Sequence, residues 1–250
     1  MSAHRLANGP YWFSTNDSRI ETLGGALSHS KSPSDFSISY EVIGERESIV
    51  RSFLGCPEFL LGSIRFFSSQ RHVAAGLAPQ EDVASHGYIE DTVMMLELTE
   101  KFDSSQWASE FQRSLMSSID KIEKLCMLSE AYKTATLLYG NQVLGTLTAA
   151  SPNNGELVSQ LLALIDALKD RSLFKCLLWP TFVAGLHCQE QDQQGFIIDS
   201  LRIIWNLTNC LNAISASNIL KYHWEQMKTP KPLYKVAPGP NELDHYWLLI

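Results

Sequence analysis

Apolar side chains recur at steps of three and four residues through most of this 250-residue chain. The clearest run places Trp107, Phe111, Leu115, Ile119, Ile122 and Leu125 on one side of a helix. No stretch alternates apolar and polar residues for long, as a half-buried β-strand would. The sequence therefore predicts an all-α fold, an irregular multi-helix bundle of roughly eight to ten helices of ordinary length with a kinked central helix.

The periodic segments define a set of expected helices, separated by breaks at Gly, Pro and Asn. They cover residues 45–53, a segment that begins at Pro57, then 82–97, 104–125, 129–147, 156–168, 173–188, 196–211 and 216–227, with a final short helix at Tyr246, Trp247 and Leu248. Ser104 and Ser105 are plausible N-caps for the helix that starts there. In the segment 82–97, we expect Ile89, Val93 and Leu96 to face the core.

Composition divides the chain into an arm and a domain. Residues 1–40 are rich in Ser, Asn, Gly and Pro, which predicts a loosely ordered N-terminal arm. Residues 41–250 are expected to form one helical regulatory-type domain, because 250 residues suit a single large core better than two small ones. Within it, residues 229–244 form a proline-punctuated connector of extended character.

Charge and targeting signals exclude several classes of protein. The formal net charge of −7 and the pI near 5.5 argue against a broad basic surface, so direct DNA binding by this chain is not expected. Lysines form a modest basic cluster at Lys221, Lys228, Lys231 and Lys235. We interpret it as a solvated face, and a contact site for an acidic partner is the less favoured interpretation. The start of the sequence lacks a signal peptide, and no apolar stretch of about 20 residues predicts a membrane span.

Metal and cofactor chemistry is not visible in the sequence. The five cysteines are odd in number, scattered and set in apolar runs, which is typical of reduced, buried thiols. His187 and Cys188 are adjacent, so on a helix they point about 100° apart and do not chelate one ion easily. No cofactor and no metal site are predicted.

Two groups of polar residues are candidate sites. The carboxylates Glu90, Asp91, Glu97 and Glu100 are spread over several helical turns, whereas a magnesium-diphosphate enzyme needs them close together. Solvated charge on a helix face is the favoured interpretation. The asparagines Asn206, Asn209 and Asn212 fall at every third residue and could line one stripe. Polar contacts between packed helices explain that stripe as well as a ligand site does.

The segment LLWPTFVAGLHC, residues 177–188, interrupts the most apolar part of the chain with Trp179-Pro180 and Gly185. Pro180 removes one backbone donor and clashes with the preceding turn, so it predicts a kink or a helix start. Gly185 allows another helix to approach closely. Both features are explained by packing at the centre of a helical bundle, without any ligand.

This segment and the one that follows resemble the end of the fungal-specific transcription factor domain. Trp179, Pro180, Phe182, Ala184 and Gly185 match the Trp-Pro-x-Phe-x-x-Gly pattern of that family. The later tryptophan of the family's last helix falls at Trp224, and the segments 54–67 and 130–144 also agree. The order and spacing of these segments carry the resemblance more than any one of them does.

The resemblance implies an all-helical regulatory region of the kind attached to a zinc binuclear cluster that binds DNA. The six-cysteine module of the family is absent from this chain, and the first helices of the family's domain are missing before residue 40. We therefore expect a transcription-regulator-like domain that acts through other proteins or senses a small molecule, without its own DNA-binding module.

The expected mode of action stays open at this point. A ligand pocket, if formed, is expected around Trp179, Phe182, His187, Trp205 and Asn209, because apolar and polar side chains mix there. The expected partners are other transcription regulators, a second copy of the chain or a small metabolite, in the nucleus or cytoplasm. The alternatives are a stand-alone helical enzyme of fungal secondary metabolism, cyclase-like in type, and a degenerate fragment with an exposed apolar face on the Phe59–Phe67 helix.

Overall fold

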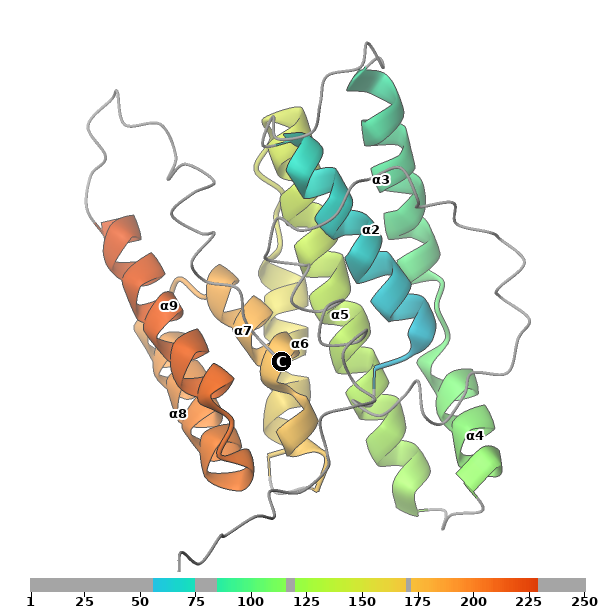
Figure 1. Cartoon of the computed structure of the whole chain (residues 1–250), viewed down its shortest axis with the longest axis vertical. Helices are drawn as coiled ribbons and strands as arrows, with labels where there is room; N and C mark the ends of the chain where they lie inside the picture. Colours follow the sequence, from blue (N-terminus) through green and yellow to red (C-terminus); the bar gives the residue numbers. More distant parts are fainter. Residues whose placement is uncertain (1–55, 75–84, 116–119, 170–171, 229–250) are drawn as a thin grey trace, which may run out of the picture.

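The computed structural model describes residues 56–74, 85–115, 120–169 and 172–228. Within these ranges the chain forms eight α-helices and one 3-10 turn and contains no strand, which confirms the all-α prediction (Figure 1). None of these helices is long and apolar enough to span a membrane. The predicted arm at residues 1–40, the helix at 45–53 and the final helix at Tyr246 lie outside the described ranges.

The helices follow the predicted order, and several boundaries differ. They are α2 (Glu58–Ala74), α3 (Ser85–Glu100), α4 (Ser104–Leu115), α5 (Asp120–Thr148), α6 (Gly155–Ala167), α7 (Leu178–His187), α8 (Gln191–Thr208) and α9 (Leu211–Lys228), with the 3-10 turn η3 (Phe174–Cys176) before α7. The prediction for α6, residues 156–168, is within one residue at each end.

Two helices organise the bundle. The 29-residue α5 contacts α2, α3, α4, α6 and α7, so it forms the axis of the first half. The short α7 contacts α5, α6, α8 and α9 and joins that half to the α8–α9 hairpin. As a result, α8 and α9 form the outermost layer on one side of the molecule, at the left of Figure 1.

The apolar face of α2 is covered by this arrangement. Leu60, Ile64 and Phe67 are completely buried, and the Phe67 ring meets the ring of Tyr139 on α5 edge to face at 6.5 Å. The exposed face on the Phe59–Phe67 helix that a degenerate fragment would show is therefore absent from α2.

The single long helix expected over residues 104–125 is wrong. Residues 104–115 belong to α4, and α5 begins at Asp120 and packs against α4. Trp107, Ala108 and Leu125 share one small buried cluster. A continuous helix would hold Trp107 and Leu125 about 27 Å apart, so they must belong to two helices that pack against each other. The apolar period is similar in both helices because both face the same cluster, and this is why the sequence did not reveal the break.

The N-cap of α4 is Asp103, not Ser104 or Ser105 as predicted. Its Oδ1 atom accepts hydrogen bonds from the backbone N–H groups of Ser105 at 2.9 Å and Gln106 at 2.8 Å. A carboxylate also interacts favourably with the positive end of the helix dipole, so Asp103 satisfies two donors and adds charge stabilisation. Ser104 is instead buried and accepts a hydrogen bond from the Ser129 hydroxyl at 3.2 Å.

The buried face of α3 agrees only in part with the predicted one. Leu96 packs against the core as predicted, but Val93 is 39% exposed. The buried residues are instead Thr92, Met95 and Thr99. The two threonine hydroxyls donate to the backbone carbonyls of Tyr88, at 2.6 Å, and Met95, at 2.8 Å, four residues earlier. These local bonds allow a threonine to enter an apolar contact, and a hydropathy pattern does not register them.

Candidate contact surface on the α8–α9 hairpin

The interruption at Trp179-Pro180 is a helix start. Pro180 occupies the third position of α7, where a missing backbone N–H leaves no helical carbonyl unpaired, and η3 precedes it. The Trp179 ring stacks on Tyr132 of α5 at 6.1 Å, with the ring planes 8° apart. The Tyr132 hydroxyl donates to the carbonyl of Cys176 at 2.8 Å. These contacts fix the entry of α7 against α5, so Trp179 is a core residue here.

Gly185 is the point where the hairpin meets α7. A Cβ atom at this position would lie 2.5 Å from Leu220 Cδ1 on α9 and 3.1 Å from Ile197 Cγ2 on α8. Its carbonyl accepts a hydrogen bond from the Trp224 indole N–H at 2.9 Å. Because no side chain intervenes, both outer helices pack directly on the backbone of α7, as the sequence predicted for a close approach.

The five residues predicted for a ligand pocket are spread over different parts of the fold. Trp179 and Phe182 are 2% and 3% exposed and belong to the central core of α7. Asn209 has φ 52°, and its N–H donates to the Trp205 carbonyl at 2.7 Å, so it is the left-handed residue that ends α8. Of the five, only Trp205 lines a groove in the surface described below.

Asn209 also breaks the predicted asparagine stripe. Asn206 lies in α8 and Asn212 in α9, with the end of one helix and the start of the next between them. The sequence predicted helices at 196–211 and 216–227, whereas α8 ends at Thr208 and α9 begins at Leu211. An asparagine in the left-handed conformation ends a helix as glycine does, and this signal was present in the sequence.

His187, the last residue of α7, has a buried Nε2 atom without a hydrogen-bond partner. Burial, and to a smaller extent the charge of nearby His223, lowers the pKa of His187. A neutral imidazole is therefore favoured in the folded chain. Burial also raises the pKa of the neighbouring Cys188 thiol to about 12, so this thiol is a poor nucleophile.

The carboxylates weighed from the sequence lie on the surface of α3. Glu90, Asp91, Glu97 and Glu100 are all exposed, and Glu97 lies 3.9 Å from the Lys101 ammonium across one turn. Over the described ranges no group of three or more His, Cys, Asp or Glu residues is placed to hold a metal ion.

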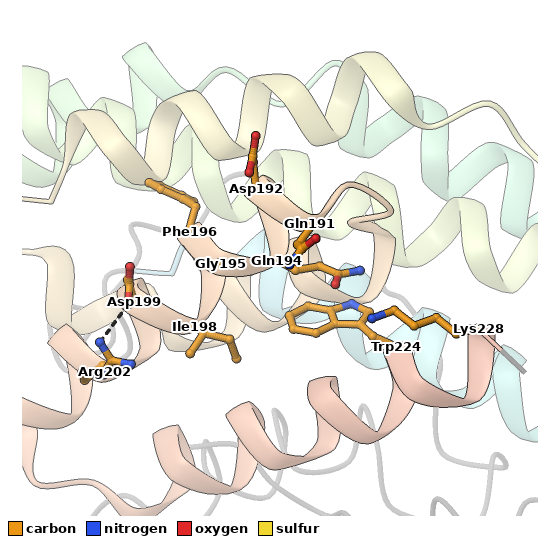
Figure 2. Close-up of a pocket in the computed structure, with 10 residues that line it drawn as sticks. All are labelled: Gln191, Asp192, Gln194, Gly195, Phe196, Ile198, Asp199, Arg202, Trp224 and Lys228. Carbon is orange, nitrogen blue, oxygen red and sulfur yellow. Dashed lines mark hydrogen bonds and ion pairs between the residues drawn. The ribbon is translucent and has the colours of Figure 1, made fainter.

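A groove runs along the seam between α8 and α9. Its larger part, about 680 Å³, lies between the start of α8 and the end of α9, where Trp224 and Lys228 face Gln191 and Gln194 (Figure 2). A smaller part, about 180 Å³, continues past Trp205 to Ile214. Both parts share Ile198 and Arg202, so they adjoin, and the larger part is a shallow groove that is open to solvent.

Positive charge is available along this groove. Arg202 is paired with Asp199 of the same helix at 2.9 Å, as Figure 2 shows. Lys221 and Lys228 lie two turns apart on α9, on the same side as Ile214 and Trp224. The sequence identified these lysines as part of a basic cluster, and α9 places two of them beside this groove.

The turn of the hairpin carries the two most exposed large apolar side chains of the described residues, and a third exposed one follows within α9. Leu211 is 69% exposed, Leu207 57% and Ile214 40%; we call these three residues the hairpin tip. They lie within residues 203–220, which contain no charged side chain although 19% of the whole chain is charged. The sequence predicted Leu207 and Leu211 within one helix over 196–211 and Ile214 between two helices, so it did not indicate that the three residues form an exposed tip.

One known protein family matches most of this chain. The model of the family described as the fungal specific transcription factor domain matches residues 75–247, a range that starts after α2 and includes α3 to α9. The matched range contains the segment 130–144 and the break at Trp179-Pro180, but not the segment 54–67. No curated protein and no solved structure matches the chain. Because the match covers more than half of its residues, this chain belongs to the fungal specific transcription factor domain family.

Proposed function

We propose that this chain is a non-enzymatic regulatory domain that acts in the nucleus by protein–protein contact through the hairpin tip. Membership of the family gives the chain a transcription-regulator-like role. The observation that carries the finer proposal is the exposure of Leu207, Leu211 and Ile214 within an uncharged stretch of the outermost layer.

The physical argument concerns the cost of leaving such a surface in water. Full burial of an exposed leucine or isoleucine supplies about 1.5–3 kcal/mol, and each of these side chains, which are 40–69% exposed, forgoes about half of that. The centres of protein interfaces are depleted of charged residues, and residues 203–220 have none. The inner faces of α8 and α9 are already used, since Ile197, Leu201 and Leu220 are buried against α7. The tip therefore supports contact with another protein, either a second copy of this chain or another regulator.

A reporter assay tests the regulatory role. The full chain is fused to an unrelated DNA-binding module, and transcription from a matching promoter is measured in a fungal cell. We expect the fusion to change the output several-fold relative to the module alone, and Leu211→Lys to remove most of that change.

Val93→Lys is the matched control. Val93 is also an exposed apolar residue, but it lies on α3, away from the hairpin. It should therefore leave the reporter output near that of the wild-type fusion. Equal losses for the two variants, or no effect of the wild-type fusion, would contradict the proposal.

Sedimentation of the full chain distinguishes the two kinds of partner. A dimer that dissociates in Leu211→Lys but persists in Val93→Lys identifies a second copy as the occupant of the tip. A monomer together with an active reporter fusion identifies another regulator. Small-molecule sensing and the cyclase-like enzyme stay predictions, and no feature of the described residues favours either over protein contact.

A further inference from the structure

The groove between α8 and α9 has a candidate occupant in the same chain. We propose that residues 241–250, NELDHYWLLI, dock into this groove and cover it. The groove and the hairpin tip share Ile214, so the docked segment would cover Ile214 and leave Leu207 and Leu211 exposed for a partner. The inference does not depend on what those two residues bind.

The groove has the character of a helix-binding site. Its walls come from two neighbouring helices, and Ile198, Trp205 and Ile214 present partly exposed apolar surface along it. The Trp224 side chain closes one end and is itself 6% exposed. An amphipathic helix laid along such a seam buries apolar side chains against both walls.

The segment 241–250 has the complementary pattern. Leu243, Tyr246, Trp247 and Ile250 fall at positions i, i+3, i+4 and i+7, which is the spacing of helix-in-groove anchors. Glu242 and Asp244 bring two negative charges to this segment.

The positive partners are already in place on the groove. Lys221 and Lys228 line its two parts, and no ion pair joins either lysine to another described residue. Of the two carboxylates that also line the groove, Asp199 is paired with Arg202, and Asp192 lies at the start of α8. Opposite charges at the rim of an apolar groove favour one orientation of the bound segment.

The connecting chain is long enough. Residues 229–240 link Lys228 to the segment and contain four prolines, so an extended linker of this length reaches about 37 Å. The groove runs from Lys228 back to Ile214, about 21 Å along α9. A segment tethered at one end of its own site has an effective concentration in the millimolar range, which favours it over a separate molecule.

The family match supports the same pairing. It extends to residue 247 and therefore spans α8, α9, the linker and the segment up to Trp247. The family pattern thus treats these elements as parts of one domain.

Photo-crosslinking in the full chain tests the proposal. Tyr246 is replaced by p-benzoyl-phenylalanine, which keeps an aromatic side chain, and crosslinked peptides are identified by mass spectrometry. We expect crosslinks within a single chain to peptides from residues 191–228. In the same background, Ile214→Lys should lower their yield several-fold.

Leu207→Lys is the control, because Leu207 is 57% exposed on the same hairpin but does not line the groove. Its crosslink yield should match that of the parent. Crosslinks between two chains would assign the groove to a second copy and overturn the proposal, as would crosslinks confined to α2–α6 or no crosslink at all. Since Leu211 takes no part in this readout, failure here leaves the reporter result for the tip intact.

Discussion

Gly185 provides the sharpest test of how the hairpin is held on α7. In Gly185→Ala, the new Cβ atom would lie 2.5 Å from Leu220 Cδ1, where carbon atoms normally stay about 3.5–4 Å apart. Leu220 and Ile197 are both completely buried, so neither has free space to move into. Overpacking of this kind costs about 1–3 kcal/mol, and the upper end applies because the overlap is about 1 Å.

Helix propensity acts in the opposite direction. Alanine is more favourable than glycine inside a helix by about 0.8–1 kcal/mol. The net expectation for Gly185→Ala is therefore a loss of about 2 kcal/mol in the free energy of unfolding. For a domain of this size, that corresponds to a fall of about 4–8 °C in the thermal midpoint.

Gly62→Ala is the matched comparison. Gly62 lies inside α2, and no atom lies within 4 Å of the position that its Cβ would take. Here only the helix propensity changes, so we expect a gain of about 0.5–1 kcal/mol. The measurement is the unfolding midpoint by circular dichroism under identical conditions.

A double variant then identifies the cause. Leu220→Ala by itself should cost about 2–5 kcal/mol because it leaves a cavity. Adding Gly185→Ala to it should cost clearly less than adding it to the wild type, since the clashing carbons are gone. The reasoning is refuted if Gly185→Ala stabilises the chain as Gly62→Ala does, or if the two changes are additive.

Three further predictions concern the same region. Thr181→Val should raise the free energy of unfolding by about 1 kcal/mol in a urea titration, because the buried Thr181 hydroxyl has no hydrogen-bond partner. Trp224→Phe should lower the free energy of unfolding by about 1–2 kcal/mol, because the hydrogen bond from the indole N–H to the Gly185 carbonyl is lost. The Cys188 N–H still donates to that carbonyl at 3.3 Å, so the carbonyl keeps one partner. An unchanged unfolding midpoint would contradict this. The folded-state pKa of His187 is lowered below 6.5, so its contribution to stability is full above pH 6.5 and is lost as the pH falls below that value. His187→Gln should therefore flatten the decline in unfolding free energy between pH 7 and pH 5, and an unchanged slope would assign that decline to other groups.

Much of this fold is local in origin, and the sequence predicted that part. The helical period, the loop before α6 and the break at Pro180 depend on residues close together in the chain. The cap at Asp103 and the left-handed Asn209 are also local, and they were assigned incorrectly because Ser and Gly are the more familiar residues at such positions.

The residues predicted for a pocket occupy different parts of the fold for another reason. Trp179, Phe182 and Trp205 are apolar residues on neighbouring helices, and such side chains can pack against a ligand or against one another equally well. Trp179 stacks on Tyr132, from a segment about 45 residues earlier, and no local pattern encodes that choice.

The sequence by itself determined that this chain is helical, that the Trp-Pro break must either kink a helix or start one and that a helix can approach Gly185 closely. Steric limits on proline and the absence of a Cβ in glycine impose these results wherever the chain folds. Only the tertiary structure decided which side of each helix meets another. Packing α7 between α5 and the hairpin used the inner faces of α8 and α9, and it left the tip residues Leu207 and Leu211 exposed to solvent. That outcome depends on contacts between distant segments, which a periodic pattern along the chain does not specify.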